Sequence, residues 1–266
     1  MTDAAGPSRD GAPTLTVVFP AYNDAGTIAS MVVAARLTAR RVTDDFEIVV
    51  VNDGSVDQTG DILIELEKWI PELRVVHHAS NQGYGSALRS GFARATKELV
   101  FYTDGDAQFD PRELTLLLEA LTPDVDYVSG YKRHRADPAL RVVLGRPYHA
   151  LLRQAFGLKL RDVDCDFRLF RRSVLERLEL HGTNGTFGIE LLKKLEDARF
   201  RFREVPVNHY PRVWGRSQYY TLRHVLCQYV ELFRLWLELS VRKTHLRPAP
   251  SSLPGVATAD ETNLAP

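Results

Sequence analysis

The stretch FYTDGDAQFDP, residues 101–111, holds two aspartates one residue apart, Asp104 and Asp106, directly after an apolar run. Gln108 continues the spacing, and alternate side chains of extended backbone point the same way, so the three can face one ligand. Gly105 between them allows backbone to approach closely. Carboxylate oxygens completed by substrate phosphates and water are the usual ligands of Mg²⁺. The stretch therefore predicts a metal and phosphate site, whereas Asp110, followed by a proline, is typical of a helix start.

Three more polar motifs follow apolar runs in the same way. AYND follows residues 15–20, a run that we expect Pro20 to end, while NDGS follows 46–52 and NQGYG follows 73–78. A fourth apolar run, 98–104, leads into Asp104 and Asp106, and helical patterns separate the runs, as at 26–38 and 85–95. This alternation predicts an α/β fold, with a parallel sheet covered on both faces. Ligands of such sheets bind beyond the carboxyl ends of the strands, where the four motifs meet.

The second half of the chain is less regular. The expected extended segments are 125–132 and 201–211, the expected helices are 140–156, 188–198 and 219–241, and 162–178 reads as loop, short strand and helix. We expect a folded domain over 14–220 and an amphipathic helix over 221–243. The polar ends, 1–13 and 244–266, are rich in small residues and proline, which is typical of disorder.

Composition excludes several classes of protein. Lys plus Arg and Asp plus Glu both total 34, so no net charge points to nucleic acid. Two cysteines, Cys165 and Cys227, cannot form a disulfide framework or a four-cysteine metal site. Neither a signal peptide nor an apolar run long enough to cross a bilayer is visible, which predicts a cytoplasmic protein. Between Tyr131 and Arg172, eleven Lys and Arg face four Asp, so this segment forms a solvated basic face or meets phosphate or an anionic membrane.

Asp53 stands at the end of the second apolar run, before Gly54 and Ser55. A carboxylate in this place can accept a hydrogen bond from a nucleobase. Ser55 and Asp57 instead suit the capping of the helix that follows.

The motifs VVFPAYNDAGTI, EIVVVNDGSVDQT, NQGYGSALRSGFARA and DGDAQFDP together closely resemble family 2 glycosyltransferases of the GT-A fold. The branch looks like polyprenyl-phosphate glycosyltransferases such as dolichyl-phosphate mannose synthase, over roughly residues 14–220. The resemblance implies a Rossmann-like, mostly parallel sheet, a nucleotide-diphosphate sugar donor (UDP or GDP), Mg²⁺ or Mn²⁺, and inversion at the anomeric carbon.

The resemblance also implies roles for individual residues. Those expected at the nucleotide sugar are Pro20, Ala21, Tyr22, Asp24, Asp53, Gly83, Asp104, Gly105, Asp106, Arg212 and Ser217. The metal ligands would be Asp104, Asp106 and Gln108. Asp24 stands where the family usually has Glu, a longer arm, and Gly105 where it more often has Ala. Gly215 would belong to a loop that orders over the donor.

The segment RDVDCDFRLFRRSVL matches the family less closely, because Cys165 and Asp166 replace a small residue and a glycine. Arg168 is expected to contact an acceptor or donor phosphate through its planar fork, or else to pair with a nearby aspartate.

The implied reaction is an in-line displacement in which the metal at Asp104 and Asp106 neutralises the departing nucleoside diphosphate. A lipid phosphate acceptor is already an anion, whereas a hydroxyl needs a base. Asp162 and Asp164 are the candidates for that base, with Glu190 a weaker one, and capping or salt bridging is the alternative role of each.

The acceptor predicted from the resemblance is a polyprenyl phosphate, reached at the inner face of the cell membrane. The last helix would pack on the core or lie in the membrane interface with Tyr229 and Trp236 at the headgroups. The alternatives are transfer to a hydroxyl of a soluble or polymeric glycan and a catalytically silent scaffold that only binds nucleotide. A dehydrogenase is disfavoured, because its glycines would have to follow the first strand.

Overall fold

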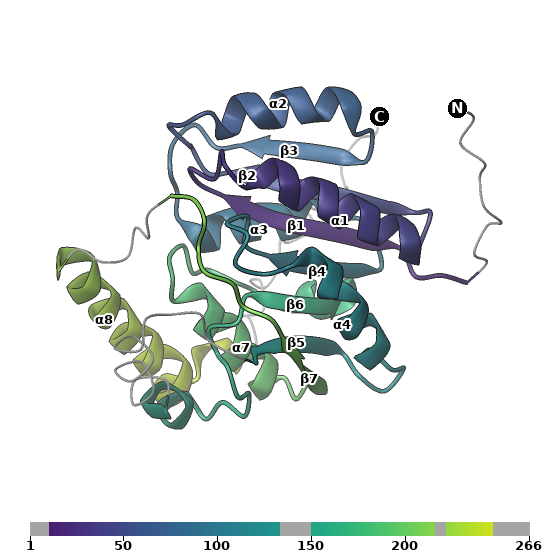
Figure 1. Cartoon of the computed structure of the whole chain (residues 1–266). Helices are drawn as coiled ribbons and strands as arrows, with labels where there is room; N and C mark the ends of the chain where they lie inside the picture. The colour runs from purple at the N-terminus through teal and green to yellow at the C-terminus, as the bar shows by residue number, and fades with distance from the viewer. Residues whose placement is uncertain (1–10, 134–149, 216–221, 247–266) are drawn as a thin grey trace, which may run out of the picture.

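The computed structural model describes residues 11–133, 150–215 and 222–246, which form one seven-stranded sheet between two layers of helices (Figure 1). The strands are β1 (Leu15–Ala21), β2 (Phe46–Asn52), β3 (Leu73–His77), β4 (Leu99–Thr103), β5 (Tyr127–Lys132), β6 (Phe167–Arg171) and β7 (Phe202–Val207). The main helices are α1 (Ile28–Val42), α2 (Thr59–Trp69), α3 (Tyr84–Arg94), α4 (Leu114–Ala120), α6 (Arg172–Leu175), α7 (Phe187–Asp197) and α8 (Leu222–Trp236).

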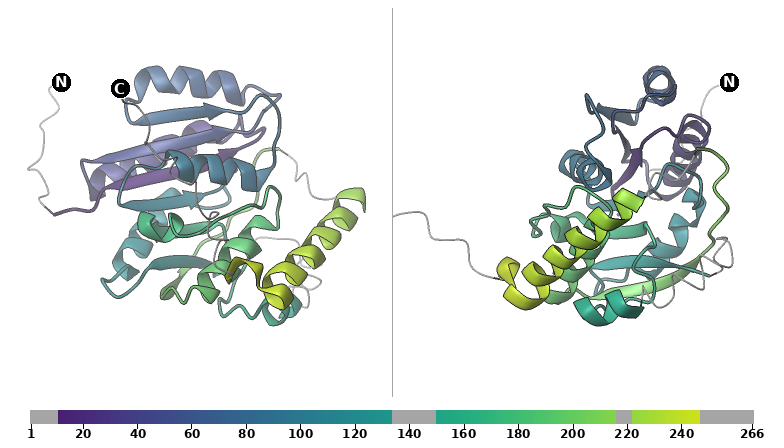
Figure 2. Two further views of the ribbon diagram at one scale, coloured as in Figure 1. Left: turned by 180° about the vertical axis from the view of Figure 1, so that it is seen from behind. Right: turned by 90° about the vertical axis from the view of Figure 1, so that its left-hand side faces the viewer.

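Alternation along the strands divides the core into two layers. Val17 and Phe19 of β1 pack with α1, α2 and α4, whereas Val18 packs with α3 and α7 on the opposite face. The views from behind and from the side show helices on both faces of the sheet (Figure 2). Successive side chains of a strand point to opposite faces, so strands buried on both sides must be apolar throughout. This confirms the expected α/β sheet covered on both faces.

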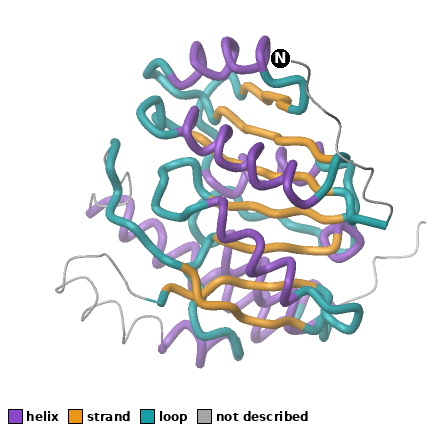
Figure 3. Tube along the Cα trace, turned by 45° about the vertical axis from the view of Figure 1, so that its right-hand side comes forward, coloured by secondary structure: helices purple, strands orange, loops and turns teal. Residues whose placement is uncertain are grey.

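The strand order β3-β2-β1-β4-β6-β5-β7 puts the ends of four parallel strands at one edge (Figure 3). β1 to β4 are mutually parallel, so the segments after Ala21, Asn52, His77 and Thr103 leave the sheet on the same side. β6 runs antiparallel to both β4 and β5, and Phe167 at its start pairs with Thr103 at the end of β4. The residues that enter β6 therefore lie beside those that leave β4.

Some element boundaries differ from the expected ones. β1 continues through Pro20 to Ala21, and its pairing with β4 already ends at Val18, so the missing N–H of Pro20 costs no hydrogen bond to β4. Residues 150–156 are helical, while the expected helix residues 140–149 lie outside the described part of the chain. Asp110 accepts a hydrogen bond from the Arg112 backbone N–H, and Pro111 opens a 3₁₀ turn (Pro111–Glu113) before α4, as expected.

Helix α8 packs on the core with one face and exposes the other. Leu235 and Trp236 contact the layer that contains α7, and the Trp236 indole donates to the Ala155 carbonyl at 3.0 Å. Tyr229 and Phe233 are exposed. In an interfacial helix, Trp236 would lie at the headgroups. Here it packs on the core instead, where its indole N–H is hydrogen-bonded. Leu237–Arg242 continue the helix as π-helical turns.

Candidate active site

Asp104, Asp106 and Asp166 form an acidic cluster where β4 ends and β6 begins. Burial, followed by the charges of Asp166 and Asp106, raises the pKa of Asp104 well above its usual range. Burial also raises the pKa of Asp106. Asp166, half-buried, pairs with Arg168, and Tyr84 Oη donates to Asp104 Oδ1 at 2.8 Å. Carboxylates held this close in a buried place attract a cation.

Arg212 supplies a positive charge to this cluster. Its Nη2 lies 2.5 Å from Asp106 Oδ2, in the segment that follows β7. Gln108 ties the same segment down, because its backbone carbonyl accepts from Tyr210 N at 2.9 Å and its side-chain amide donates to the Tyr210 carbonyl at 3.3 Å. Gln108 N in turn donates to Asp106 Oδ1. The structure thus brings Asp106, Gln108 and Arg212 together.

Asp24 lies next to this cluster, in the turn after β1. Its Oδ2 accepts from Tyr22 N at 3.0 Å, and burial raises its pKa from 3.8 to about 6. Gly105 packs against the same turn, where an added Cβ would lie 3.2 Å from the Pro20 carbonyl and 3.4 Å from Asp24 Oδ2. The close approach expected at Gly105 is therefore an approach to the AYND turn.

Asp53 organises the loop before α3. Its Oδ1 accepts from Gln82 N and its Oδ2 from Gly83 N, both at 2.9 Å. His78 Nδ1 lies 2.6 Å from Oδ1. A carboxylate has about four lone-pair positions, so the three contacts leave one for a ligand. Gly83 adopts φ 96°, a conformation that glycine accepts readily.

Near Asp53, neither of the two residues expected to cap the next helix is its N-cap, which is Gln58. Asp57 Oδ1 accepts from Thr59 N, the first residue of α2. Ser55 Oγ instead accepts from Asn23 N and joins the loops that follow β1 and β2.

Arg168 is fully buried within the sheet. In register with Tyr102 of β4 and Ser129 of β5, it donates to the Tyr102 hydroxyl, to Asp166 Oδ1 at 3.1 Å and to the Val163 carbonyl at 2.9 Å. Of the two expected roles, the structure shows the pairing with a nearby aspartate. The guanidinium contacts Asp166, which in turn lies beside Asp104. Arg168 thus holds the side chain of Asp166.

The three candidate bases lie in different surroundings. Asp162 is buried and accepts from Lys132 N and Asp164 N, whereas Asp164 is exposed. Glu190 is buried in α7, pairs with Lys194 at 2.6 Å and accepts from Gly182 N at 2.6 Å. Glu190 thus has the surroundings of a structural carboxylate. Ser217 lies outside the described residues, and Gly215 has φ 74°.

The acidic cluster suits a metal that completes its shell with substrate. Within residues 11–133, 150–215 and 222–246, no three His, Cys, Asp or Glu side chains are grouped so as to hold a metal by themselves. Two carboxylates with ligands from a diphosphate and water are what Mg²⁺ commonly uses. Burial, and then the charges of Asp166 and Asp106, raise the pKa of Asp104, and a bound cation would offset both effects. Asp104 and Asp106 therefore fit a substrate-completed site.

Comparison with known proteins decides the family. The model of glycosyl transferase family 2 matches residues 16–179. The chain belongs to this family. Glycosyltransferase AglD of Haloferax volcanii is 31% identical over 240 residues, which cover 86% of this chain and 38% of that protein. The undecaprenyl-phosphate 4-deoxy-4-formamido-L-arabinose transferase of Edwardsiella ictaluri is 31% identical over 217 residues, 81% of this chain and 66% of the relative. The chain thus spans between about two fifths and two thirds of these relatives.

Solved structures show the fold of this member of the family. Glucosyl-3-phosphoglycerate synthase from Mycobacterium tuberculosis, in complex with Mn²⁺, uridine diphosphate and phosphoglyceric acid, matches with a TM-score of 0.65. The alignment is 21% identical and covers 85% of this chain and 78% of the synthase. The expected GT-A fold with a mostly parallel sheet is confirmed.

Sequence patterns missed two residues of the site. From the sequence, Asp166 is only a departure from the family, because nothing local shows that β6 runs antiparallel to β4 and brings this aspartate next to Asp104. Tyr84 lies within NQGYG and is the first residue of α3. An aromatic residue at a helix start beside glycines was the only local signal.

Proposed function

We propose that this family 2 glycosyltransferase moves a sugar from a nucleoside-diphosphate sugar to a polyprenyl phosphate, with inversion and with Mg²⁺ or Mn²⁺. The observation that carries the proposal is the pair of Asp104 and buried Asp106 after β4, with Arg212 at 2.5 Å from Asp106. Relatives support the acceptor, since several are undecaprenyl-phosphate 4-deoxy-4-formamido-L-arabinose transferases. Crystals of the structural neighbour with uridine diphosphate and Mn²⁺ or Mg²⁺ support the donor and the cation.

The residues have distinct tasks in this proposal. Asp53, Tyr22 and Asp24 would hold the base and ribose, with Pro20, Ala21 and Gly83 forming the walls. Asp104, Asp106 and Gln108 would hold the cation, which neutralises charge on the leaving diphosphate. Arg212, and Ser217 beyond the described residues, would contact phosphate. Arg168 would hold Asp166 in place, since its guanidinium is buried.

We further propose that residues 14–220 are the transferase domain and that α8 faces the membrane at its inner surface. Within the described residues no helix is both long and apolar enough to span a bilayer. Exposed Tyr229, Val230 and Phe233 on α8 would meet the lipid that carries the acceptor.

A hydroxyl acceptor is a second candidate, favoured by one observation. Asp166 adds a partly exposed third carboxylate beside Asp104 and Asp106, which disfavours an anionic acceptor and suits one that must lose a proton. Asp162 and Asp164 remain candidates for the same task.

The test is transfer from a panel of UDP- and GDP-sugars to undecaprenyl phosphate and to soluble glycans, with Mn²⁺ or with EDTA. We expect metal-dependent transfer to the lipid, and a loss of about 10²- to 10³-fold in Asp106→Asn. Asp110→Asn, a capping variant outside the site, is the matched control and keeps its activity. Absence of any metal-dependent nucleotide binding would refute the proposal, and transfer to hydroxyls alone would replace its acceptor.

A further inference from the structure

The loop formed by residues 181–186, which precedes α7, packs against the first turn of α3. The Thr183 carbonyl accepts from Gly85 N at 2.8 Å and from Ser86 N at 3.3 Å. A Cβ added to Gly83 would lie 2.4 Å from the same carbonyl. The two segments are thus in direct backbone contact. A displacement of the 181–186 loop would therefore also move residues 83–86.

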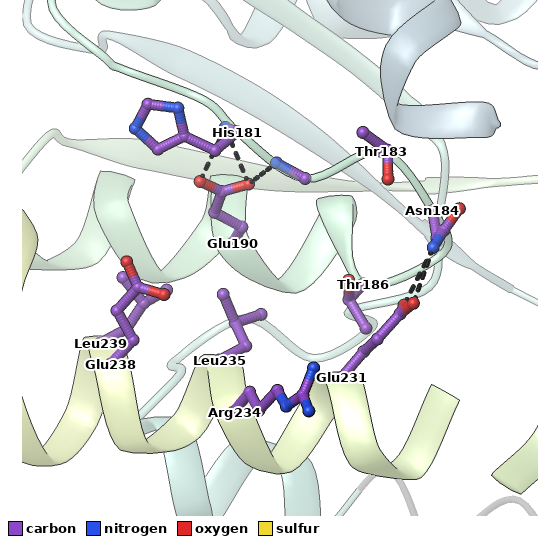
Figure 4. A pocket seen from close by; sticks show the side chains of 11 residues that line it. His181, Thr183, Asn184, Thr186, Glu190, Glu231, Arg234, Leu235, Glu238 and Leu239 are labelled. Atoms are coloured by element: carbon purple, nitrogen blue, oxygen red, sulfur yellow. Dashed lines mark hydrogen bonds between the residues drawn. The ribbon is translucent and has the colours of Figure 1, made fainter. Parts of the chain in front are cut away.

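Two carboxylates hold the 181–186 loop, one at its start and one at its middle. Glu190 of α7 accepts from the backbone N–H groups of His181 and Gly182. Glu231 of α8 accepts from Asn184 Nδ2 with both oxygens, at 2.9 and 3.0 Å, as Figure 4 shows. The first anchor belongs to the helix that the loop enters. The second comes from a helix 47 residues further along the chain.

A cavity of about 250 Å³ lies between this loop and α8, lined among others by Thr186, Glu231 and Leu235. Figure 4 shows the side chains of the loop and of α8 facing each other across it. Close packing therefore does not fix the loop on this side. Its position relative to α8 depends on the Asn184 and Glu231 hydrogen bonds.

Residues 82–84 connect the loop to both ends of the candidate donor site. Asp53 holds Gln82 N and Gly83 N on the side of the base. Tyr84 Oη donates to Asp104 Oδ1 on the side of the diphosphate. The path from Glu231 to Asp104 thus runs through Asn184, the Thr183 carbonyl and the first turn of α3.

We propose that Glu231 and Asn184 are positioning residues of the donor site, through which α8 sets the geometry of residues 83–86 and of Asp104. The proposal deepens the glycosyltransferase function proposed above and rests on it. Hydrogen bonds to a charged acceptor are among the stronger ones, so this pair is suited to the task. Neither residue contacts donor in this scheme, and both act through Tyr84.

The decisive variants are Glu231→Ala, Glu231→Gln and Glu238→Ala. Glu231→Ala leaves Asn184 without its acceptor, and we expect a rise of about five- to tenfold in the donor KM, with kcat changed by less than about twofold. Glu231→Gln keeps one acceptor oxygen and should restore the donor KM to within about twofold of the wild type. Glu238→Ala removes a carboxylate from the same cavity without touching the loop and serves as the matched control.

Amide hydrogen exchange gives a readout that needs no substrate. In Glu231→Ala, the amides of Gly85 and Ser86 should exchange about fivefold faster, while those of β2 stay unchanged. Exchange is measured without nucleotide, so it decides the coupling even if the wild type binds neither UDP nor GDP. Exchange rates at Gly85 equal to those of the wild type would overturn the inference.

Asn184→Ala provides an independent arm should Glu231→Ala fold poorly. If the two residues act as a pair, the double variant is no worse than either single variant. Effects on donor KM that add up in the double variant would also overturn the inference.

Discussion

Tyr84 Oη donates a 2.8 Å hydrogen bond to Asp104 Oδ1 and so joins the first turn of α3 to the end of β4. Burial and the charge of Asp104 raise the pKa of Tyr84 well above its usual value, so the phenol remains a donor at every working pH. The bond fixes the orientation of a carboxylate that we propose as a metal ligand.

Tyr84→Phe should therefore weaken metal-dependent nucleotide binding by about five- to tenfold, because Asp104 loses the bond that orients it. Calorimetric titration of the nucleoside diphosphate in the presence of Mn²⁺ measures the change. Tyr229→Phe, on the exposed face of α8, is the control and binds like the wild type. Equal affinities for Tyr84→Phe and the wild type would contradict the role.

Arg212→Met distinguishes the effects of the Arg212 guanidinium and of a bound metal ion on Asp106. Without the guanidinium at 2.5 Å, Mn²⁺ alone should bind about five- to tenfold more tightly, because a competing positive charge is lost. The nucleoside diphosphate should bind more weakly, because its phosphates lose a bidentate partner. Electron paramagnetic resonance counts bound Mn²⁺, and a parallel loss of both affinities would show that Arg212 only maintains the fold of its segment.

The raised pKa of Asp24 predicts that the difference in stability between the wild type and Asp24→Asn depends on pH. Its folded pKa, about 6, lies above the usual 3.8, so the associated stability is present below pH 3.8 and is lost as pH rises through 6. Asp24→Asn stays neutral and keeps an oxygen for Tyr22 N. At pH 7.5 the variant should be more stable by up to about 3 kcal/mol, and near pH 4 the two proteins should be nearly equal. Urea unfolding at both pH values measures this, and a difference that does not change with pH would contradict it.

Asp166→Asn distinguishes the two acceptors. A lipid phosphate needs no base, so kcat should stay within about threefold of the wild type if the acceptor is a polyprenyl phosphate. With a hydroxyl acceptor that relies on Asp166, kcat should fall by about 10²-fold or more. The amide keeps an oxygen for Arg168, and thermal unfolding checks that the buried guanidinium remains satisfied.

The first half of the fold follows from local pattern. Apolar, β-branched runs are long enough to define β1 to β4 within one or two residues, and the polar motifs after them lie at the expected edge. The carboxylates Asp104 and Asp106 with Arg212 are brought together, and Gly105 makes the close approach that its size allows. Which of these residues binds donor or metal stays a prediction.

The remaining features depend on contacts between distant segments, which leave no periodic pattern. Nothing near Asp166 reveals that β6 pairs antiparallel with β4, and nothing near Arg168 reveals that Tyr102 and Ser129 enclose it. The anchoring of the 181–186 loop by Glu231 joins residues 47 positions apart. The sequence favours packing of the last helix on the core over contact with lipid, and Trp236 packs there with its indole N–H on the Ala155 carbonyl.

The reversed direction of β6 has a consequence for how such an enzyme can diversify. Since β6 starts where β4 ends, the residues that enter β6 lie at the same edge of the sheet as the loops that follow β1 to β4. The length and sequence of the segment before β6 can change while the ladder between Thr103 and Phe167 stays intact. In the proposed function, β1 to β4 would carry the residues that hold the donor, and the segment before β6 would face the acceptor. A change of acceptor would then require changes in that segment alone.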